Sequence, residues 1–182
     1  YTVSNDVLKA ISDTVTPQGV VCTVKMKQNS FEYEKGRKYI ALDTIQNPDN
    51  LGAISRTAEA LGLDGMVICG GCDIYNPKAL RASMGALFRL PIFICQNLED
   101  EIAKCEEMGI NTFATVPDRD AENIVTVDFS KGGMCIIGNE GNGVSKEIIE
   151  KCNHRITIKM DGRAESLNAS AAASIVMWEM AR

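Results

Sequence analysis

Short apolar runs alternate with amphipathic segments along most of the chain. The run Tyr39-Ile40-Ala41-Leu42-Asp43 is too short for a helix and is typical of a buried strand. Apolar residues at helical spacing over residues 98–108 predict an amphipathic helix that ends at Gly109. The same patterns predict strands over residues 39–43, 65–69, 90–95, 111–116, 134–138 and 155–160, and helices over 48–61, 77–83, 98–108 and 145–152, with a final helix that begins at Ser166.

Helix start signals support this order of elements. Asn47-Pro48 offers an N-cap side chain followed by proline at the first helical position. Ser145 and Ser166 are the expected caps of the last two helices. Strands that alternate with helices build a mainly parallel sheet with helices on both faces, so the predicted fold class is α/β.

The first part of the chain follows a different pattern. A short helix is expected over residues 5–12, a turn at 16–19, an edge strand at 20–26 and a polar loop over 27–37. Because the chain begins with Tyr1 rather than Met, we expect a fragment or a processed product. We interpret residues 1–37 as a remnant or linker from an N-terminal region, and residues 38–182 as the main domain.

Composition limits the possible classes of protein. With 182 residues, 45% of them hydrophobic, the chain suits one globular domain. No apolar run is long enough for a membrane span. The net charge of -5 argues against a broad basic surface for nucleic acid, so such a partner needs a local patch or a further domain.

The seven cysteines predict neither disulfides nor a metal site. Cys69 and Cys72 form one C-x-x-C pair, but a zinc site needs a second pair, and His154 is the only histidine. Unpaired cysteines fit a reducing, cytoplasmic location.

Three polar clusters could carry chemistry. Residues 45–62 (IQNPDNLGAISRTAEALG) place Asn50 in the first turn of a helix and Arg56 about two turns along it. Residues 136–145 (IIGNEGNGVS) hold three glycines around Glu140, in the order G-x-x-G-x-G rather than the dinucleotide-binding G-x-G-x-x-G. The third cluster stands between a strand and a helix, and consists of Glu165, Ser166, Asn168 and Ser170. Each cluster taken alone also fits a capped helix or a structural turn.

Together and in this order, the clusters resemble the motifs of the SpoU/TrmH family of ribose 2′-O-methyltransferases, in the SPOUT superfamily. NPDNLGAISRTAEALG matches the first motif, IIGNEGNGVS the second and IKMDGRAESLNASAAASI the third, and NPKALRASMGALFRLP between them is also typical. The resemblance covers residues 39–182. It implies a C-terminal deep trefoil knot, whose loops bind S-adenosylmethionine.

The resemblance also assigns residues to the cofactor. It implies contacts from Gly138, Ile158 and Leu167, with Thr115, Ile137 and Met160 nearby. We add Gly141, because a β-branched side chain there should block either the turn or the approach of the ligand. We expect Gly141→Val to weaken S-adenosylmethionine binding about tenfold or more.

The matched catalytic residue is Arg56, which family proposals make the general base. A guanidinium whose pKa lies above about 12 is a poor proton acceptor, so we expect Arg56 to lower the pKa of the ribose hydroxyl and to bind phosphate. Glu140 is its expected ionic partner. The residues matched to orienting roles are Asn50, Glu140, Ser166 and Asn168, and the candidate RNA contacts, for which packing or surface roles are equally compatible, are Arg81 and Arg89.

The implied partners are RNA, either rRNA (large-subunit rRNA first) or tRNA, and a second copy in a homodimer. The resemblance further implies an N-terminal RNA-binding domain before the main domain, so we expect this chain to bind RNA weakly and in a salt-dependent way. Two other classes stay open: a catalytically silent RNA-binding module and a nicotinamide-dependent oxidoreductase. The order of the glycines disfavours the oxidoreductase.

Overall fold

The computed structural model describes residues 1–12, 14–26, 31–164 and 166–182. Its centre is a seven-stranded sheet with the order β3-β2-β1-β6-β4-β7-β5, in which neighbouring strands run parallel. This confirms the predicted parallel α/β architecture. The strands are β1 (Lys38–Asp43), β2 (Gly65–Cys69), β3 (Ile92–Cys95), β4 (Thr112–Thr115), β5 (Glu122–Asn123), β6 (Gly133–Ile137) and β7 (His154–Thr157).

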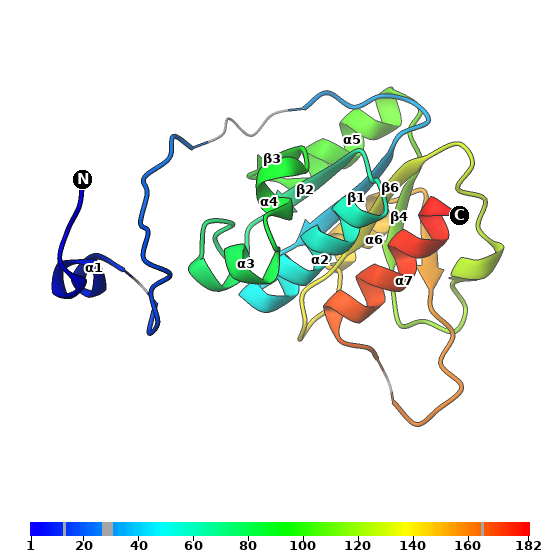
Figure 1. The fold of residues 1–182 in the computed structure, drawn as a ribbon. Coiled ribbons are helices and arrows are strands. Elements are labelled where there is room, and N and C mark those ends of the chain that lie inside the picture. Colours follow the sequence, from blue (N-terminus) through cyan, green and yellow to red (C-terminus); the bar gives the residue numbers. More distant parts are fainter. Residues whose placement is uncertain (13, 27–30, 165) are drawn as a thin grey trace.

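Helices cover both faces of the sheet, as Figure 1 shows. One face carries α2, α3, α4 and α7, and the other carries α5 and α6. The helix α1 lies apart from the sheet and buries no residue. The helices are α1 (Asn5–Ile11), α2 (Pro48–Ala60), α3 (Pro77–Ala82), α4 (Ala86–Arg89), α5 (Leu98–Glu107), α6 (Lys146–Lys151) and α7 (Ala169–Ala181), with the 3-10 turn η1 (Ile124–Thr126).

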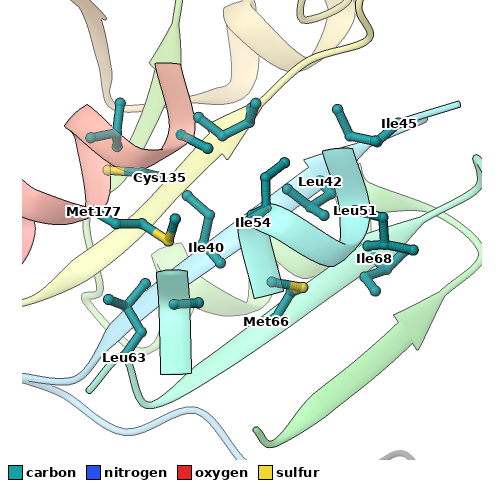
Figure 2. Packing of buried hydrophobic residues seen from close by; sticks show 14 of the residues in the cluster. Ile40, Leu42, Ile45, Leu51, Ile54, Leu63, Met66, Ile68, Cys135 and Met177 are labelled. Carbon is teal, nitrogen blue, oxygen red and sulfur yellow. The ribbon is translucent and has the colours of Figure 1, made fainter. Parts of the chain in front are cut away.

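The central strand β1 divides the core into two clusters. Ile40 and Leu42 pack with Ile54 of α2 and Met177 of α7 (Figure 2), whereas Ala41 faces the cluster under α5 and α6. Successive side chains of a strand point to opposite faces, so a strand buried on both faces is apolar throughout. The continuous apolar run of the sequence therefore marks the middle of the sheet.

Local capping fixes where the main helices begin. Asn47 accepts a hydrogen bond from the amide of Asp49 at 2.8 Å and caps α2, while Ser145 accepts one from Ile148 at 3.4 Å and caps α6. Both starts were predicted from the sequence.

The start of α7 differs from the prediction. Its N-cap is Asn168, whose Oδ1 accepts a hydrogen bond from the amide of Ser170 at 2.9 Å, whereas Ser166 is exposed and lies before the helix. Asparagine caps a helix as well as serine does, and the side chain nearest the first free amides makes the bond. Strand β7 also ends earlier than predicted, at Thr157 rather than Met160. The short helix α4 was missed.

The predicted edge strand over residues 20–26 is wrong, because this segment forms no regular structure and exposes Val20 and Val24. A strand needs a hydrogen-bonded neighbour, which alternation in the sequence cannot supply. The predicted loop over residues 27–37 lies partly outside the described residues. Within its described part, Phe31 and Tyr33 pack against the α5 face of the sheet. In the parts of the chain that the structure describes, no helix is long and apolar enough to cross a membrane.

Candidate functional site

The three sequence motifs meet at one edge of the sheet. Strands β1, β6 and β7 are parallel, so the segments that follow them leave from the same, carboxyl-terminal edge. These segments are residues 44–47, which lead into α2, residues 138–145, which lead into α6, and residues 158–168, which lead into α7.

Glu140 joins the second motif to the first. Its carboxylate accepts hydrogen bonds from the backbone amides of Gln46 and Asn47, both at 3.0 Å, and from Nδ2 of Asn50 at 2.9 Å. Burial acts to raise the pKa of the Glu140 carboxyl, but these hydrogen bonds outweigh it and hold the pKa below its ordinary value. The carboxylate is therefore ionised at neutral pH, and it neutralises the amide end of α2.

Asn50 extends this contact to the third motif. Asn50 is buried, and its Oδ1 accepts a hydrogen bond from Nδ2 of Asn168 at 3.1 Å. Asn168 in turn caps α7 through Ser170. We call Gln46, Asn47, Asn50, Glu140 and Asn168 the Glu140 network. The structure thus brings together Asn50, Glu140 and Asn168, three of the four residues matched to orienting roles, while Ser166 is exposed before α7. The orienting role itself stays a prediction.

The predicted ion pair between Glu140 and Arg56 is wrong. Both oxygens of the Glu140 carboxylate accept hydrogen bonds from the start of α2, whereas Arg56 lies farther along that helix. Within the part of the chain that the structure describes, the exposed Arg56 side chain has no hydrogen bond or ion pair. It lines a surface hollow of about 450 Å³ between α2 and α7, together with Thr57, Ala60, Leu61, Ser174, Ile175 and Trp178.

The glycine loop of the second motif is held by Asn139, which the sequence reasoning missed. Its Nδ2 donates to the carbonyl of Thr44 at 2.9 Å, and its Oδ1 accepts from the amide of Gly141 at 2.8 Å. A Cβ at Gly138 would overlap the backbone of Gly143 and Val144, so only glycine fits at residue 138. The sequence did contain a signal for this role of Asn139, because an asparagine in a turn often forms a hydrogen bond with the backbone two residues farther along.

The geometry of the turn does not require glycine at residue 141. A Cβ there would meet only Oδ1 of Asn139 at 3.4 Å, an ordinary contact, and no positive φ is recorded for this residue. The expectation that a larger side chain would block the turn is therefore wrong. An effect through the approach of a ligand stays a prediction.

The residues that the resemblance assigns to the cofactor surround the ends of β4, β6 and β7. The hydroxyl of Thr115 donates to the carbonyl of Ile136 at 2.7 Å, which ties β4 to β6. Ile137 is buried, Ile158 and Met160 are partly buried, and Leu167 is 37% exposed. Over residues 158–167, the described part has no backbone–backbone hydrogen bond. Free backbone groups beside apolar side chains fit a ligand such as S-adenosylmethionine, which has an apolar adenine and several polar atoms.

The two candidate RNA-binding arginines differ. Arg81 is exposed at the end of α3. Arg89 forms a bidentate pair with Glu59 of α2, with Nε–Oε1 at 2.7 Å and Nη2–Oε2 at 3.1 Å. Glu59 was not singled out in the sequence, although it stands three residues after Arg56.

Comparison with known proteins gives a consistent result. A model of the SpoU rRNA Methylase family matches residues 37–178. A Synechocystis protein named as an uncharacterized tRNA/rRNA methyltransferase is 35% identical over all of this chain and 67% of its own length. The 23S rRNA (guanosine(2553)-2'-O)-methyltransferase of Bacillus subtilis is 32% identical over 99% of this chain and 71% of its own length.

Solved structures are similar as well. The SpoU methyltransferase AviRb of Streptomyces viridochromogenes, in complex with the cofactor AdoMet, has a TM-score of 0.87 at 28% identity, over all of this chain and 72% of that chain. An AdoMet-bound rRNA methyltransferase of Sinorhizobium meliloti has a TM-score of 0.74 at 34% identity. There the match covers 81% of this chain and 56% of that one.

Proposed function

The chain belongs to the SpoU rRNA methylase family, and we propose that it transfers the methyl group of S-adenosylmethionine to a ribose 2′-hydroxyl of RNA. Large-subunit rRNA is the substrate that we favour over tRNA. Two similar proteins are named for 2'-O-methylation of 23S rRNA, one at a guanosine and one at a uridine. A cytoplasmic location agrees with seven cysteines that are all free thiols.

One observation carries this proposal: the Glu140 network joins three segments that are far apart in the sequence, and the helix whose start it fixes also bears the exposed guanidinium of Arg56. Asn50 is 90 residues from Glu140 and 118 residues from Asn168 along the chain, yet its amide contacts both. Such a network fixes the start of α2 relative to the loops after β6 and β7. Arg56, two turns along the same helix, is thereby held at a fixed distance from the proposed cofactor loops.

Each residue then has a role in methyl transfer. S-adenosylmethionine, when bound, supplies a methyl group on a positively charged sulfur. The positively charged guanidinium of Arg56 stabilises the developing alkoxide of the ribose and attracts phosphate. Glu140, ionised and held by three N–H donors, orients the loops and moves no proton. Ser166 and Asn168, at the entry to α7, orient the ribose.

We also propose that the C-terminal segment threads through the loop over residues 116–132 to form the deep trefoil knot. After α6 on one face of the sheet, the chain passes through β7 and returns as α7 on the opposite face, where α7 contacts β1, β6 and η1. Mechanical unfolding from the two termini tests this. A knotted chain extends to less than its full contour length, whereas full extension would contradict the knot.

The proposed homodimer uses the hollow between α2 and α7. Trp178 is 58% exposed and Ile175 is 37% exposed there, beside Ala60 and Leu61. Apolar side chains of this size favour a protein partner, and a second copy would complete the surroundings of Arg56. Sedimentation of the wild type and of Trp178→Glu tests this, because a carboxylate in the apolar interface should prevent the dimer from forming.

We propose that residues 1–37 are a linker and that residues 38–182 are the methyltransferase domain.

Two measurements test the function. Calorimetry with S-adenosylmethionine and with NAD separates a methyltransferase from an oxidoreductase, and binding of neither would favour a silent module. Labelled S-adenosylmethionine is then incubated with large-subunit rRNA and with tRNA. A ribose 2′-O-methyl group protects the adjacent phosphodiester from alkali, because the 2′-hydroxyl is the nucleophile in that cleavage. Label on a base, or no label with either RNA, would overturn the proposal.

A further inference from the structure

The guanidinium of Arg89 is held beside α2 by contacts with Glu59 and with the turn before α4. It donates to both oxygens of the Glu59 carboxylate and, from Nη2, to the carbonyl of Met84 at 3.4 Å. A Cβ at Gly85 would lie 2.7 Å from Nη1 of Arg89, so the guanidinium also rests against the turn before α4. The two-pronged geometry is the strongest form of a carboxylate–guanidinium contact.

This contact decides which way Glu59 points. Glu59 follows Arg56 by three residues on α2, and opposite charges at that spacing on a helix attract each other. Glu59 is thus the natural partner of Arg56. Both oxygens of its carboxylate are instead occupied by Arg89, and hydrogen bonding from Arg89 lowers the pKa of Glu59. In residues 31–164, where all three side chains lie, Arg56 has no ion pair.

We propose that Arg89 is a positioning residue, which holds the Glu59 carboxylate away from Arg56 and so keeps the Arg56 guanidinium free for RNA. This inference rests on the proposed function, in which Arg56 acts on the ribose and phosphate. It gives Arg89 a role within the protein, which differs from the RNA contact that the sequence suggested. A released Glu59 would both neutralise Arg56 and repel the phosphates of the substrate.

The first test is a set of three variants: Arg89→Ala, Glu59→Gln and the double variant. We expect Arg89→Ala to lower kcat/KM for RNA about two- to fivefold, the range that an exposed ion pair can supply. Glu59→Gln should stay near the wild type, because glutamine has no charge to offer Arg56. The double variant should recover the rate of Glu59→Gln. A purely structural contact would instead leave the double variant as slow as Arg89→Ala, which would overturn the proposal.

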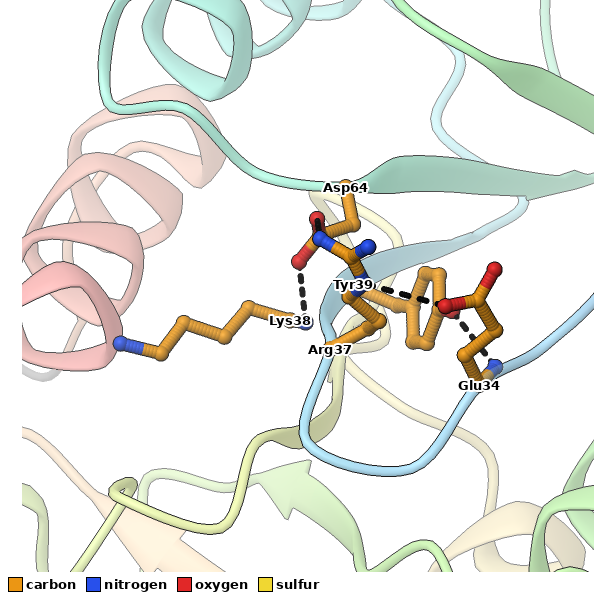
Figure 3. Close-up of polar contacts among 5 residues, drawn as sticks. All are labelled: Glu34, Arg37, Lys38, Tyr39 and Asp64. Carbon is orange, nitrogen blue, oxygen red and sulfur yellow. Dashed lines mark hydrogen bonds and ion pairs between the residues drawn. The ribbon is translucent and has the colours of Figure 1, made fainter.

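Arg37→Ala is the matched control. Arg37 also contacts two carboxylate groups, those of Glu34 and Asp64, directly before β1 begins (Figure 3). Its loss should leave kcat/KM unchanged. S-adenosylmethionine affinity and the unfolding temperature are measured for every variant, and Arg89→Lys, which keeps a charge near Glu59, serves if Arg89→Ala does not fold.

The second test needs no activity. Phenylglyoxal modifies free guanidinium groups, and peptide mass spectrometry reports the extent at Arg56. We expect less modification of Arg56 in Arg89→Ala than in the wild type, and recovery in the double variant. Unchanged labelling would overturn the proposal. If labelling shifts as expected but the wild type methylates no RNA, the proposed function fails while the role of Arg89 stands.

Discussion

The two ends of the sheet both carry polar groups, but they use them differently. At the amino-terminal end, Arg37 donates to Glu34 and Asp64, and Asp64 also accepts from the amide of Lys38 at 2.8 Å (Figure 3). We call Glu34, Arg37, Lys38, Tyr39 and Asp64 the amino-end cluster. These partners lie 3 to 27 residues apart, and the central cation is paired. The Glu140 network joins residues about four times as far apart.

The environment of the two clusters differs as well. The ring of Tyr39 stacks on Phe31 with centroids 5.4 Å apart, and Tyr33 packs edge-on against both. The amino-end cluster therefore packs against a group of aromatic rings. The carboxyl end instead has the loops after β6 and β7, which the Glu140 network joins to the start of α2. A cluster of paired charges that packs on aromatic rings stabilises the fold, whereas polar contacts between loops at the carboxyl ends of parallel strands suit a functional site.

The largest effect is expected at Arg56. Arg56→Ala should reduce methyl transfer about a hundredfold or more, because it removes the charge that stabilises the alkoxide. Affinity for S-adenosylmethionine should stay within a few-fold, since Arg56 lies outside the cofactor loops. Labelled methyl transfer and calorimetry measure the two quantities. Near wild-type transfer by a folded variant would contradict the proposed role of Arg56.

The next effect is a contrast between two glycines of one loop. Gly138→Ala should lower the unfolding temperature and weaken S-adenosylmethionine binding more than tenfold, which is about 1.4 kcal/mol, because its Cβ would overlap the loop backbone. Gly141→Val should weaken binding by a similar factor through the ligand alone, with the unfolding temperature unchanged. Equal affinity of the wild type and Gly141→Val for S-adenosylmethionine would show that the ligand does not lie close to residue 141.

A smaller effect is expected at the amino end. Tyr33 donates to the buried carboxylate of Glu101 at 2.9 Å, and Tyr33→Phe leaves that oxygen without this donor. We expect a loss of about 1–3 kcal/mol in the free energy of unfolding, measured by urea titration. Methyl transfer at a temperature where the variant is folded should equal that of the wild type. A loss of activity without a loss of stability would contradict the view that the amino end serves stability and not catalysis.

The smallest effect concerns Glu140 and pH. Its pKa in the folded protein lies below the usual 4.5, so its contribution to stability is fully present above that value and is lost as the pH falls through the folded pKa. The difference in unfolding temperature between wild type and Glu140→Gln should therefore be constant from neutral pH to the usual pKa, and then shrink. A difference that grows in acid would mean that the hydrogen bonds do not favour the ionised form.

The sequence by itself determined the elements and the motif residues. Caps at Asn47 and Ser145 and the apolar run of β1 act over a few neighbouring residues, so their effect is visible in the local pattern. The motifs named Asn50, Glu140 and Asn168, which meet at one edge of the sheet, whereas Arg56 lies farther along α2.

Only the tertiary structure decided which of these groups meet. Glu140 binds the start of α2 rather than Arg56, Asn168 binds Asn50, and Arg89 binds Glu59. These outcomes depend on the packing of α2 against α4 and α7, and on strand order, which bring together residues that are 30 to 118 positions apart. Local propensity acts within about a turn of helix. Which of several possible partners a charged side chain binds therefore depends on the distances that tertiary packing sets.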